Sequence, residues 1–280
     1  AYDVRLSLVG SEMCIRDSCY TASKNLCAIG GMVANNAAGE KTLRYGKMEN
    51  YVVDLKVVFS DANEYVVRPL TKTELDAKIA VNDFEGNLYK HIFEMIQQNQ
   101  AEITAAKPRV SKNSAGYYLW NVWNGETFDL TKLIVGSQGT IGIVTEVTLK
   151  LVPVKKISKL FVIFMPKLEK LGSVVNEILE FKPESVESYD DSTMKMAVRF
   201  LPEMLKSMKT AGFFKLILSF IPEVFMMLTG GIPKLILLVE FGGENEKEID
   251  QTMIALQKKI AHFKFKTRLT RSVSEAEKYW

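Results

Sequence analysis

A branched, apolar segment that ends at a proline divides this sequence into two parts. Residues 141–152 place isoleucine, valine and leucine at many positions, a pattern that predicts a strand. Pro153 stops that strand, because proline has no backbone N–H to donate to a sheet. We therefore expect a domain boundary next to Pro153. The residues before it form the first side of the boundary, and the residues after it form the second.

The first side contains a hairpin followed by helices. Residues 51–59 read as a strand, residues 60–63 as a turn, and residues 64–68 as the partner strand. Thr71 followed by Glu74 matches a capping box, which starts a helix. Apolar residues then recur at helical spacing in a segment that ends near Gln100. Two helices should follow the hairpin.

The second side alternates strand and helix patterns. The expected strands cover residues 160–164, 185–189 and 234–241. The expected helices cover residues 167–181 and 247–261, with a further helix-rich stretch before Leu228. This alternation predicts a separate α+β domain with an antiparallel sheet.

Composition excludes several classes of protein. With 47% hydrophobic and 25% charged residues, the 280-residue chain is globular, and its net charge of +3 is spread without the basic stripe that nucleic acid requires. The three cysteines have neither a disulfide nor a zinc pattern, so a reducing, cytoplasmic location is expected. His91 and His262 lie far from other metal-binding residues, so no metal site is expected in this chain.

An apolar segment at residues 213–228 has two interpretations. Lys215, Pro222 and Glu223 interrupt it, and it is too short to span a bilayer. It either packs as helices against the sheet of the second domain, as short apolar segments usually do, or lies in the surface of a membrane. The second interpretation implies peripheral contact at the inner face of the membrane.

Three runs of small and polar residues are candidates for a binding site. Residues 28–39 combine glycine, alanine and asparagine, so main-chain N–H groups could approach a diphosphate. Residues 136–142 place three glycines before a strand, with neither P-loop nor Rossmann spacing. Residues 112–119 bring a lysine, an amide and two tyrosines close to Gly116. Taken singly, each run could equally be a turn or a helix start.

In this order, the three runs resemble FAD-linked oxidases and dehydrogenases with a PCMH-type (vanillyl-alcohol-oxidase-like) flavin domain. That family has T-I-G-G-x-V-A-x-N-A-G-G followed by R-Y-G, similar to residues 28–39 and 44–46 here, and G-S-E-G-T-L-G-I-I-T-E, similar to residues 136–146. Ala28, Ala38 and Gln138 depart from the pattern. Within the family, the sequence resembles D-lactate dehydrogenase, the D subunit of glycolate oxidase and D-2-hydroxyglutarate dehydrogenase.

The resemblance implies a fold and a set of FAD-binding positions. The fold is α+β: the second part of the flavin domain at residues 19–153, then an incomplete, ferredoxin-like substrate-binding cap at residues 154–280. Gly116 and Tyr117 would approach the reactive face of the flavin, and residues 138–144 would wrap its ring or ribityl side. The implied FAD-binding residues are Ser23, Ile29, Gly30, Gly31, Asn35, Gly39, Tyr45, Gly46, Gly116, Tyr117, Gln138, Gly139, Thr140, Ile141, Gly142, Ile143 and Val144.

The ends of the chain carry two further expectations. Residues 8–18 resemble a translated transposase adapter from DNA sequencing, so residues 1–18 are expected to be non-native and to make no regular contacts. The family's first flavin subdomain, its substrate-binding arginine and the ligands of a divalent metal would lie outside residues 1–280. The catalytic residues are therefore expected beyond Trp280, and this fragment alone should be inactive.

The implied reaction is oxidation of a 2-hydroxy acid such as D-lactate or glycolate, by hydride transfer to flavin N5. A quinone or an electron carrier would accept the electrons. Other interpretations are an alcohol oxidase, an enzyme like alkylglycerone-phosphate synthase, or a module that binds a membrane surface or a protein partner.

Overall fold

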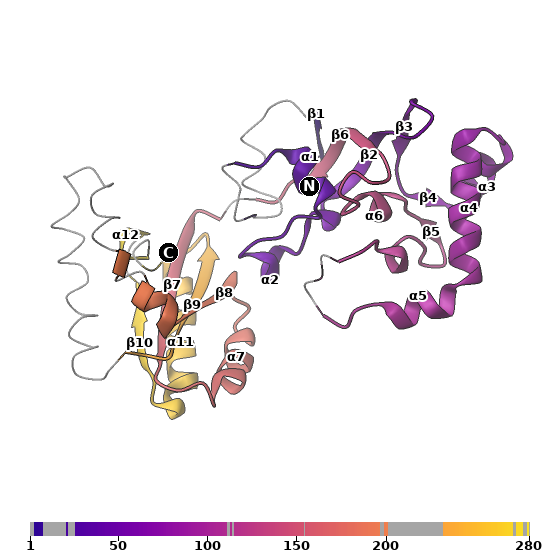
Figure 1. The fold of residues 1–280 in the computed structure, drawn as a ribbon. Coiled ribbons are helices and arrows are strands. Elements are labelled where there is room, and N and C mark those ends of the chain that lie inside the picture. The colour runs from indigo at the N-terminus through magenta and orange to yellow at the C-terminus, as the bar shows by residue number, and fades with distance from the viewer. Residues whose placement is uncertain are drawn as a thin grey trace. The chain divides into compact units, whose positions relative to one another are not determined.

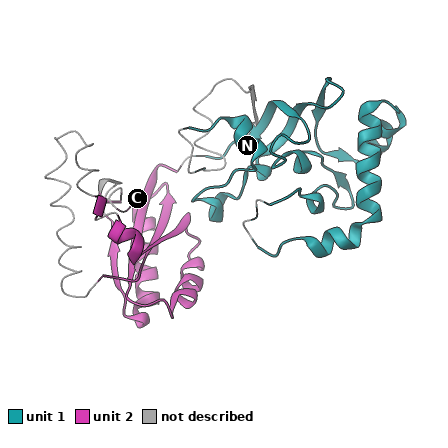
Figure 2. Ribbon diagram, viewed as in Figure 1, with its two compact units in different colours: residues 1–154 teal, residues 155–280 magenta. Residues whose placement is uncertain are grey.

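The chain folds into two compact units, Ala1–Val154 and Lys155–Trp280 (Figure 2). The computed structural model describes residues 3–7, 21, 26–110, 113, 115–153, 155–196, 199–200, 232–270, 273–276 and 279. The division falls beside Pro153, where the sequence pattern placed a boundary. Each unit combines helices with a sheet, which confirms the α+β fold class.

Unit 1 is built on a four-stranded sheet with the order β1-β6-β2-β3 (Figure 1). Its strands are β1 (Asp3–Ser7), β2 (Val52–Val58), β3 (Glu64–Val67) and β6 (Ile143–Lys150). All neighbouring strands are antiparallel. The hairpin and the strand before Pro153 therefore belong to one sheet.

Strand β1 corrects one expectation about the first residues. Asp3–Ser7 pair in antiparallel register with Lys150–Glu146 of β6, although residues before Cys19 were expected to make no regular contacts. The pairing is physically reasonable, because without it one edge of β6 would expose unpaired backbone N–H and C=O groups. Residues 8–18, which carry the adapter-like run, lie outside the described residues.

The core of unit 1 lies against this sheet. Leu55 and Val57 of β2 and Val147 and Leu149 of β6 are almost fully buried. Two short helices pack beside these strands, α1 (Ile29–Ala34) at β6 and α6 (Thr131–Ile134) at β2. Residues 29–34 of the first small-residue run therefore form a helix, and its apolar residues Ile29, Met32 and Val33 belong to the core.

Three helices follow the hairpin, where two were expected. They are α3 (Lys72–Ala80), α4 (Phe84–Gln98) and α5 (Gln100–Ala106). Asn99 interrupts the helical segment between α4 and α5. The predicted capping box is present, since the Thr71 hydroxyl accepts from the Glu74 N–H and the Glu74 carboxylate accepts from the Thr71 N–H. The smaller elements of unit 1 are α2 (Thr42–Tyr45), β4 (Leu70–Thr71), β5 (Thr127–Phe128) and 3-10 helices at Met48–Asn50 and Leu119–Asn121.

Unit 2 has a four-stranded antiparallel sheet with the order β10-β7-β9-β8. Its main elements, in chain order, are β7 (Ile157–Met165), α7 (Leu171–Leu179), β8 (Ser185–Asp190), β9 (Leu235–Gly243), α11 (Glu246–Lys259) and β10 (Lys266–Leu269). This βαββαβ order, with the third strand between the first two, is the ferredoxin-like arrangement that was expected. Strand β10 was not predicted from the sequence. Unit 2 also contains a 3-10 helix (Ile260–Phe263) and α12 (Val273–Ala276), and residues 191–196 are helical.

Strand β7 shows why this sheet needs cover on both faces. Phe161 and Ile163 pack in one cluster with residues of α7 and α11, whereas Leu160 and Val162 pack in another with residues of β9 and α12. All four side chains are buried, which explains the continuous apolar run in the sequence. Among the helices of the described residues, none combines the length and the apolar character that a membrane span needs. The apolar residues 213–228 are outside that set.

Candidate cofactor site

The first and last small-residue runs lie side by side in unit 1. The Gly136 N–H donates to the Val33 carbonyl at 3.0 Å, and the Gln138 N–H donates to the Ala34 carbonyl at 2.8 Å. These bonds fix the C-terminal end of helix α1 against the turn that leads into β6. Two segments about a hundred residues apart in the sequence therefore form one local structure.

The middle run joins the same place through Tyr117. The hydroxyls of Tyr117 and Thr140 lie 2.7 Å apart, a hydrogen-bond distance. Tyr117 is 46% exposed, whereas its neighbour Tyr118 is buried. The structure thus brings all three predicted runs together, with one tyrosine at the surface and the next anchored inside.

Three glycines near these contacts have open space at the position where a side chain would begin. A Cβ added at Gly31, Gly116 or Gly139 would meet no atom of the described chain within 4 Å. Gly116 and Gly139 also have φ values of +71° and +77°, which side-chain-bearing residues rarely adopt. Space of this kind lets a ligand approach the main chain closely.

Gly142 differs from these three glycines, because its Cβ position is surrounded by atoms of strand β2. A Cβ there would lie 2.7 Å from Val57 Cγ1, 2.9 Å from the Val58 carbonyl oxygen and 3.2 Å from Phe59 Cδ1. Its φ is not in the positive region. Strand β2 therefore fills the space next to Gly142 on the side where a Cβ would lie, and the implied flavin contact of this residue stays a prediction.

Other predicted residues of the last run take different environments. Gln138 and Thr140 are exposed, and the apolar side chain of Ile143 is 66% exposed. Ile141 and Val144 are partly buried against the core of unit 1. The exposed members continue the surface formed by the bare glycines.

Several of the remaining predicted residues are buried or form hydrogen bonds within the chain. Ile29 is buried in the core, and Asn35 is exposed at the end of α1. The Gly39 N–H donates to the Thr42 hydroxyl at 2.9 Å, so it is already bonded within the chain. The Tyr45 carbonyl accepts from the Tyr51 hydroxyl at 2.5 Å.

Gly30, Gly46 and Ser23 are the last of the predicted FAD-binding residues. Gly30 lies within α1, and Gly46 has a φ of +73° at the end of α2. Ser23 lies outside the described residues.

A buried polar cluster beside the three runs was not predicted. Lys47 and Glu49 form an ion pair at 2.9 Å, with each side chain only 10% exposed. Burial acts to lower the pKa of Lys47, but its hydrogen bonds to Glu49 and Tyr118 outweigh this and raise the pKa above its usual value. Local sequence patterns carry little signal for this cluster, because Tyr118 lies 71 positions away from Lys47.

Asn36 connects this cluster to helix α1. Its side chain is 2% exposed and its backbone has a φ of +44°. Its Oδ1 accepts from the Glu49 N–H at 3.0 Å, whereas its Nδ2 has no hydrogen-bond partner among the described residues. A buried amide donor without a partner is costly in a protein, so a polar ligand group nearby would be favourable.

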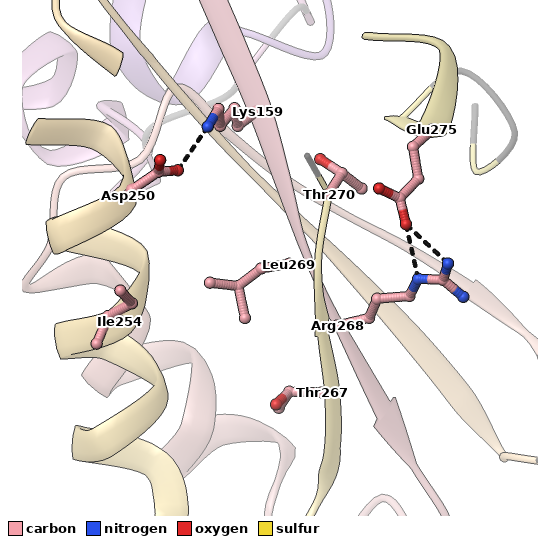
Figure 3. Close-up of a pocket in the computed structure, with 8 residues that line it drawn as sticks. All are labelled: Lys159, Asp250, Ile254, Thr267, Arg268, Leu269, Thr270 and Glu275. Atoms are coloured by element: carbon pink, nitrogen blue, oxygen red, sulfur yellow. Dashed lines mark hydrogen bonds and ion pairs between the residues drawn. The ribbon is translucent and has the colours of Figure 1, made fainter. Parts of the chain in front are cut away.

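Unit 2 has a separate hollow of about 750 Å³ beside strand β10 (Figure 3). Lys159 Nζ lies 2.6 Å from an Asp250 carboxylate oxygen, and Arg268 forms an ion pair with Glu275 at 2.7 Å. The charges that line the hollow are therefore engaged with one another. None of the predicted site residues lies there. Among the described residues, no cluster of three or more His, Cys, Asp or Glu side chains could hold a metal ion.

Solved structures define the class of fold. Alkyldihydroxyacetonephosphate synthase matches 99% of this chain with a TM-score of 0.58 and 14% sequence identity, and the match covers 41% of that protein. A second crystal form of the same enzyme gives a TM-score of 0.52 at 13% identity, over 92% of this chain and 36% of that one. At this level of identity the likeness concerns the fold alone: the two units of this chain fold like part of that synthase.

Curated relatives then narrow the resemblance. D-2-hydroxyglutarate dehydrogenase of Escherichia coli is 24% identical over 84% of this chain and 22% of its own length. Glycolate oxidase subunit GlcD of Bacillus subtilis is 28% identical over 62% of this chain and 27% of its own length. Mitochondrial D-lactate dehydrogenase of Arabidopsis thaliana is 29% identical over 52% of this chain and 17% of its own length.

These relatives confirm the resemblance to 2-hydroxy acid oxidoreductases that the motifs indicated. No protein-family model matches the chain. The chain spans between 17% and 27% of the lengths of these three relatives.

Proposed function

We propose that this chain is part of an FAD-dependent oxidoreductase and that unit 1 holds the flavin. The observation that carries this proposal is that the three small-residue runs contact one another and contain glycines with open space where a side chain would be. Gln138 is bonded to the end of α1, and Tyr117 is bonded to Thr140, so the segments form one surface. The names of the relatives agree with an oxidoreductase.

The residues on this surface suit a large, planar and polar ligand. Gly31, Gly116 and Gly139 leave space at the backbone, and Ile143 offers an exposed apolar side chain. The unpartnered Nδ2 of Asn36 supplies a buried donor near Gly136, which a polar ligand group or an enclosed water would satisfy. FAD, when bound, would supply the hydride acceptor for the oxidation of the substrate.

The protein's own contribution at this site would be to bind and orient the cofactor. Glycines at positive φ hold the backbone in conformations that expose main-chain groups, and the Tyr117–Thr140 bond fixes two segments relative to each other. These arrangements need no charged residue at the ligand surface. Rigid placement of this kind lowers the cost of ordering a bound cofactor.

For the substrate, we propose a small 2-hydroxy acid. The relatives act on D-2-hydroxyglutarate, glycolate and D-lactate according to their names. Unit 2 would be the substrate-binding cap of residues 154–280, as its ferredoxin-like sheet and the family resemblance suggest. No catalytic residue is assigned in either unit.

The test uses the protein expressed from its complete gene. We expect a yellow protein with one FAD per chain, whose flavin absorbance near 450 nm bleaches when D-2-hydroxyglutarate, D-lactate or glycolate is added without oxygen. The L-isomers serve as stereochemical controls. A protein that carries no flavin after refolding with excess FAD would refute the assignment.

Other substrate classes remain outcomes of the same assay. Bleaching by an aryl alcohol or an alditol, with none by the hydroxy acids, would favour an alcohol oxidase. Flavin that binds but is reduced by none of these compounds would favour an enzyme of the alkylglycerone-phosphate synthase kind. Co-sedimentation with vesicles of anionic lipid tests membrane contact separately.

A further inference from the structure

Lys47 lies inside unit 1 next to the candidate flavin surface, yet it belongs to none of the three runs. Its ammonium lies 2.9 Å from Glu49 Oε1, 3.0 Å from the Tyr118 hydroxyl and 3.0 Å from the Asn113 carbonyl oxygen. A lysine ammonium has three N–H donors, so each donor has its own acceptor. A buried charge that is this fully bonded holds its partners in one arrangement.

Two of these three partners lie at the ends of one short loop. Asn113 and Tyr118 flank Gly116 and Tyr117, and the Tyr118 hydroxyl also donates to the Asn113 carbonyl. The Lys47 ammonium lies 4.3 Å from the centre of the Tyr118 ring, which adds a cation–π attraction. Both ends of the loop are therefore tied to a single buried cation.

The other side of Lys47 is held equally firmly. The Glu49 N–H donates to Asn36 Oδ1 at 3.0 Å, and Lys132 Nζ donates to the Glu49 carbonyl at 2.5 Å. Asn121 Nδ2 donates to the second carboxylate oxygen of Glu49 at 3.3 Å. Through Glu49, the cation thus links Asn36, two residues after helix α1, to the loop that carries Tyr117.

We propose that Lys47 is a positioning residue for the flavin site: by tying Asn113 and Tyr118 together, it holds Tyr117 against Thr140. The proposal rests on the proposed function of unit 1. It differs from a purely structural role, because Tyr117 and Gly116 are exposed and contribute little to the core. Loss of the cation would free this exposed loop and would also leave the buried Glu49 carboxylate without its ion-pair partner.

The first experiment compares two lysine substitutions in the complete protein. Lys47→Met removes the ammonium and keeps an unbranched stem. Lys78→Met is the matched control, because Lys78 pairs with Glu85 at 2.5 Å and lies 5.0 Å from the centre of the Tyr89 ring, in the helix pair α3–α4. We expect the FAD dissociation constant to rise at least tenfold for Lys47→Met and to stay within about twofold of the parent for Lys78→Met.

A milder variant and a double variant test the mechanism. Tyr118→Phe removes one acceptor of Lys47 and keeps the ring, and it should weaken FAD binding in the same direction if Lys47→Met fails to fold. Adding Tyr117→Phe to Lys47→Met should weaken binding less than the two single effects multiplied, since both act through the same contact. Fully multiplicative effects, or FAD binding unchanged in Lys47→Met and Tyr118→Phe, would overturn the proposal.

A measurement without flavin separates this proposal from the proposed function. In the flavin-free protein, amide hydrogen exchange at residues 115–119 should be faster in Lys47→Met than in the parent and in Lys78→Met. If the parent binds no FAD but this difference appears, the function is wrong and the positioning contact is real. If the parent binds FAD and the exchange rates are equal, Lys47 does not order the loop.

Discussion

Gly142 provides the sharpest test of what the last glycine run does. The structure places strand β2, and not an open space, where its side chain would be. In Gly142→Ala the new Cβ would lie 2.9 Å from the Val58 carbonyl oxygen and 2.7 Å from Val57 Cγ1. The Val57 side chain is fully buried, and Val57 and Val58 pair with Val144 and Ile143 of β6, so neither neighbour can move without disturbing the sheet.

The size of the effect follows from these contacts. Overpacking a core costs about 1–3 kcal/mol, and a clash with a main-chain oxygen belongs at the upper end of that range. Replacing glycine also lowers the conformational entropy of the unfolded chain, which offsets this destabilisation by about 0.4–1 kcal/mol. The free energy of unfolding of unit 1 should therefore fall by about 2 kcal/mol, which for roughly 150 residues lowers its midpoint by about 4–8 °C.

Calorimetry of the complete protein, with and without added FAD, measures this change. Gly31→Ala is the matched control, because it lies in helix α1 and its Cβ would meet no described atom within 4 Å. That variant should keep or slightly raise the unfolding midpoint of the flavin-free protein while weakening FAD binding. A Gly142→Ala protein that melts like the parent but loses its flavin would refute the steric reasoning.

Three further predictions concern stability elsewhere. Gly172→Ala, in helix α7 with no described atom within 4 Å of the new Cβ, should raise the unfolding free energy of unit 2 by about 0.5–1 kcal/mol in urea titrations. The Arg68 guanidinium and the Thr71 N–H lower the pKa of Glu74 from 4.5 to about 2, so its stabilising effect is complete above pH 4.5 and is lost as the pH falls towards 2; the stability difference between the parent and Glu74→Gln should shrink over that interval in pH-dependent melts. Met253→Ala, in the core between α11 and the sheet, should cost about 2–5 kcal/mol by denaturant unfolding.

Much of the fold could be predicted because the relevant signals are local. The strand before Pro153 and the capping box at Thr71 depend on neighbouring residues, and both are present in the structure. Strand β10 was missed because it has only four residues and follows a helix without a strong turn signal. Its place at the edge of the sheet depends on pairing with β7, about a hundred residues earlier.

The candidate site was predictable in its motifs and unpredictable in its contacts. The glycine runs could be found because their composition is unusual, and the structure brings them together. The roles of individual glycines could not be separated, since Gly139 and Gly142 look alike in sequence and differ in backbone φ and in the atoms that lie beside them. Lys47 was missed because a single lysine is usually exposed, and its burial depends on partners far along the chain.

The strand order of unit 2 also fixes the order in which its sheet can be completed during synthesis. Strands β7 and β8 are made first, yet they are not neighbours, and each pairs with β9. The nascent chain therefore carries β7 and β8 without their shared partner strand until residues 235–243 emerge from the ribosome. The length of the connection at residues 191–234 should then govern how fast unit 2 folds more than how stable it becomes.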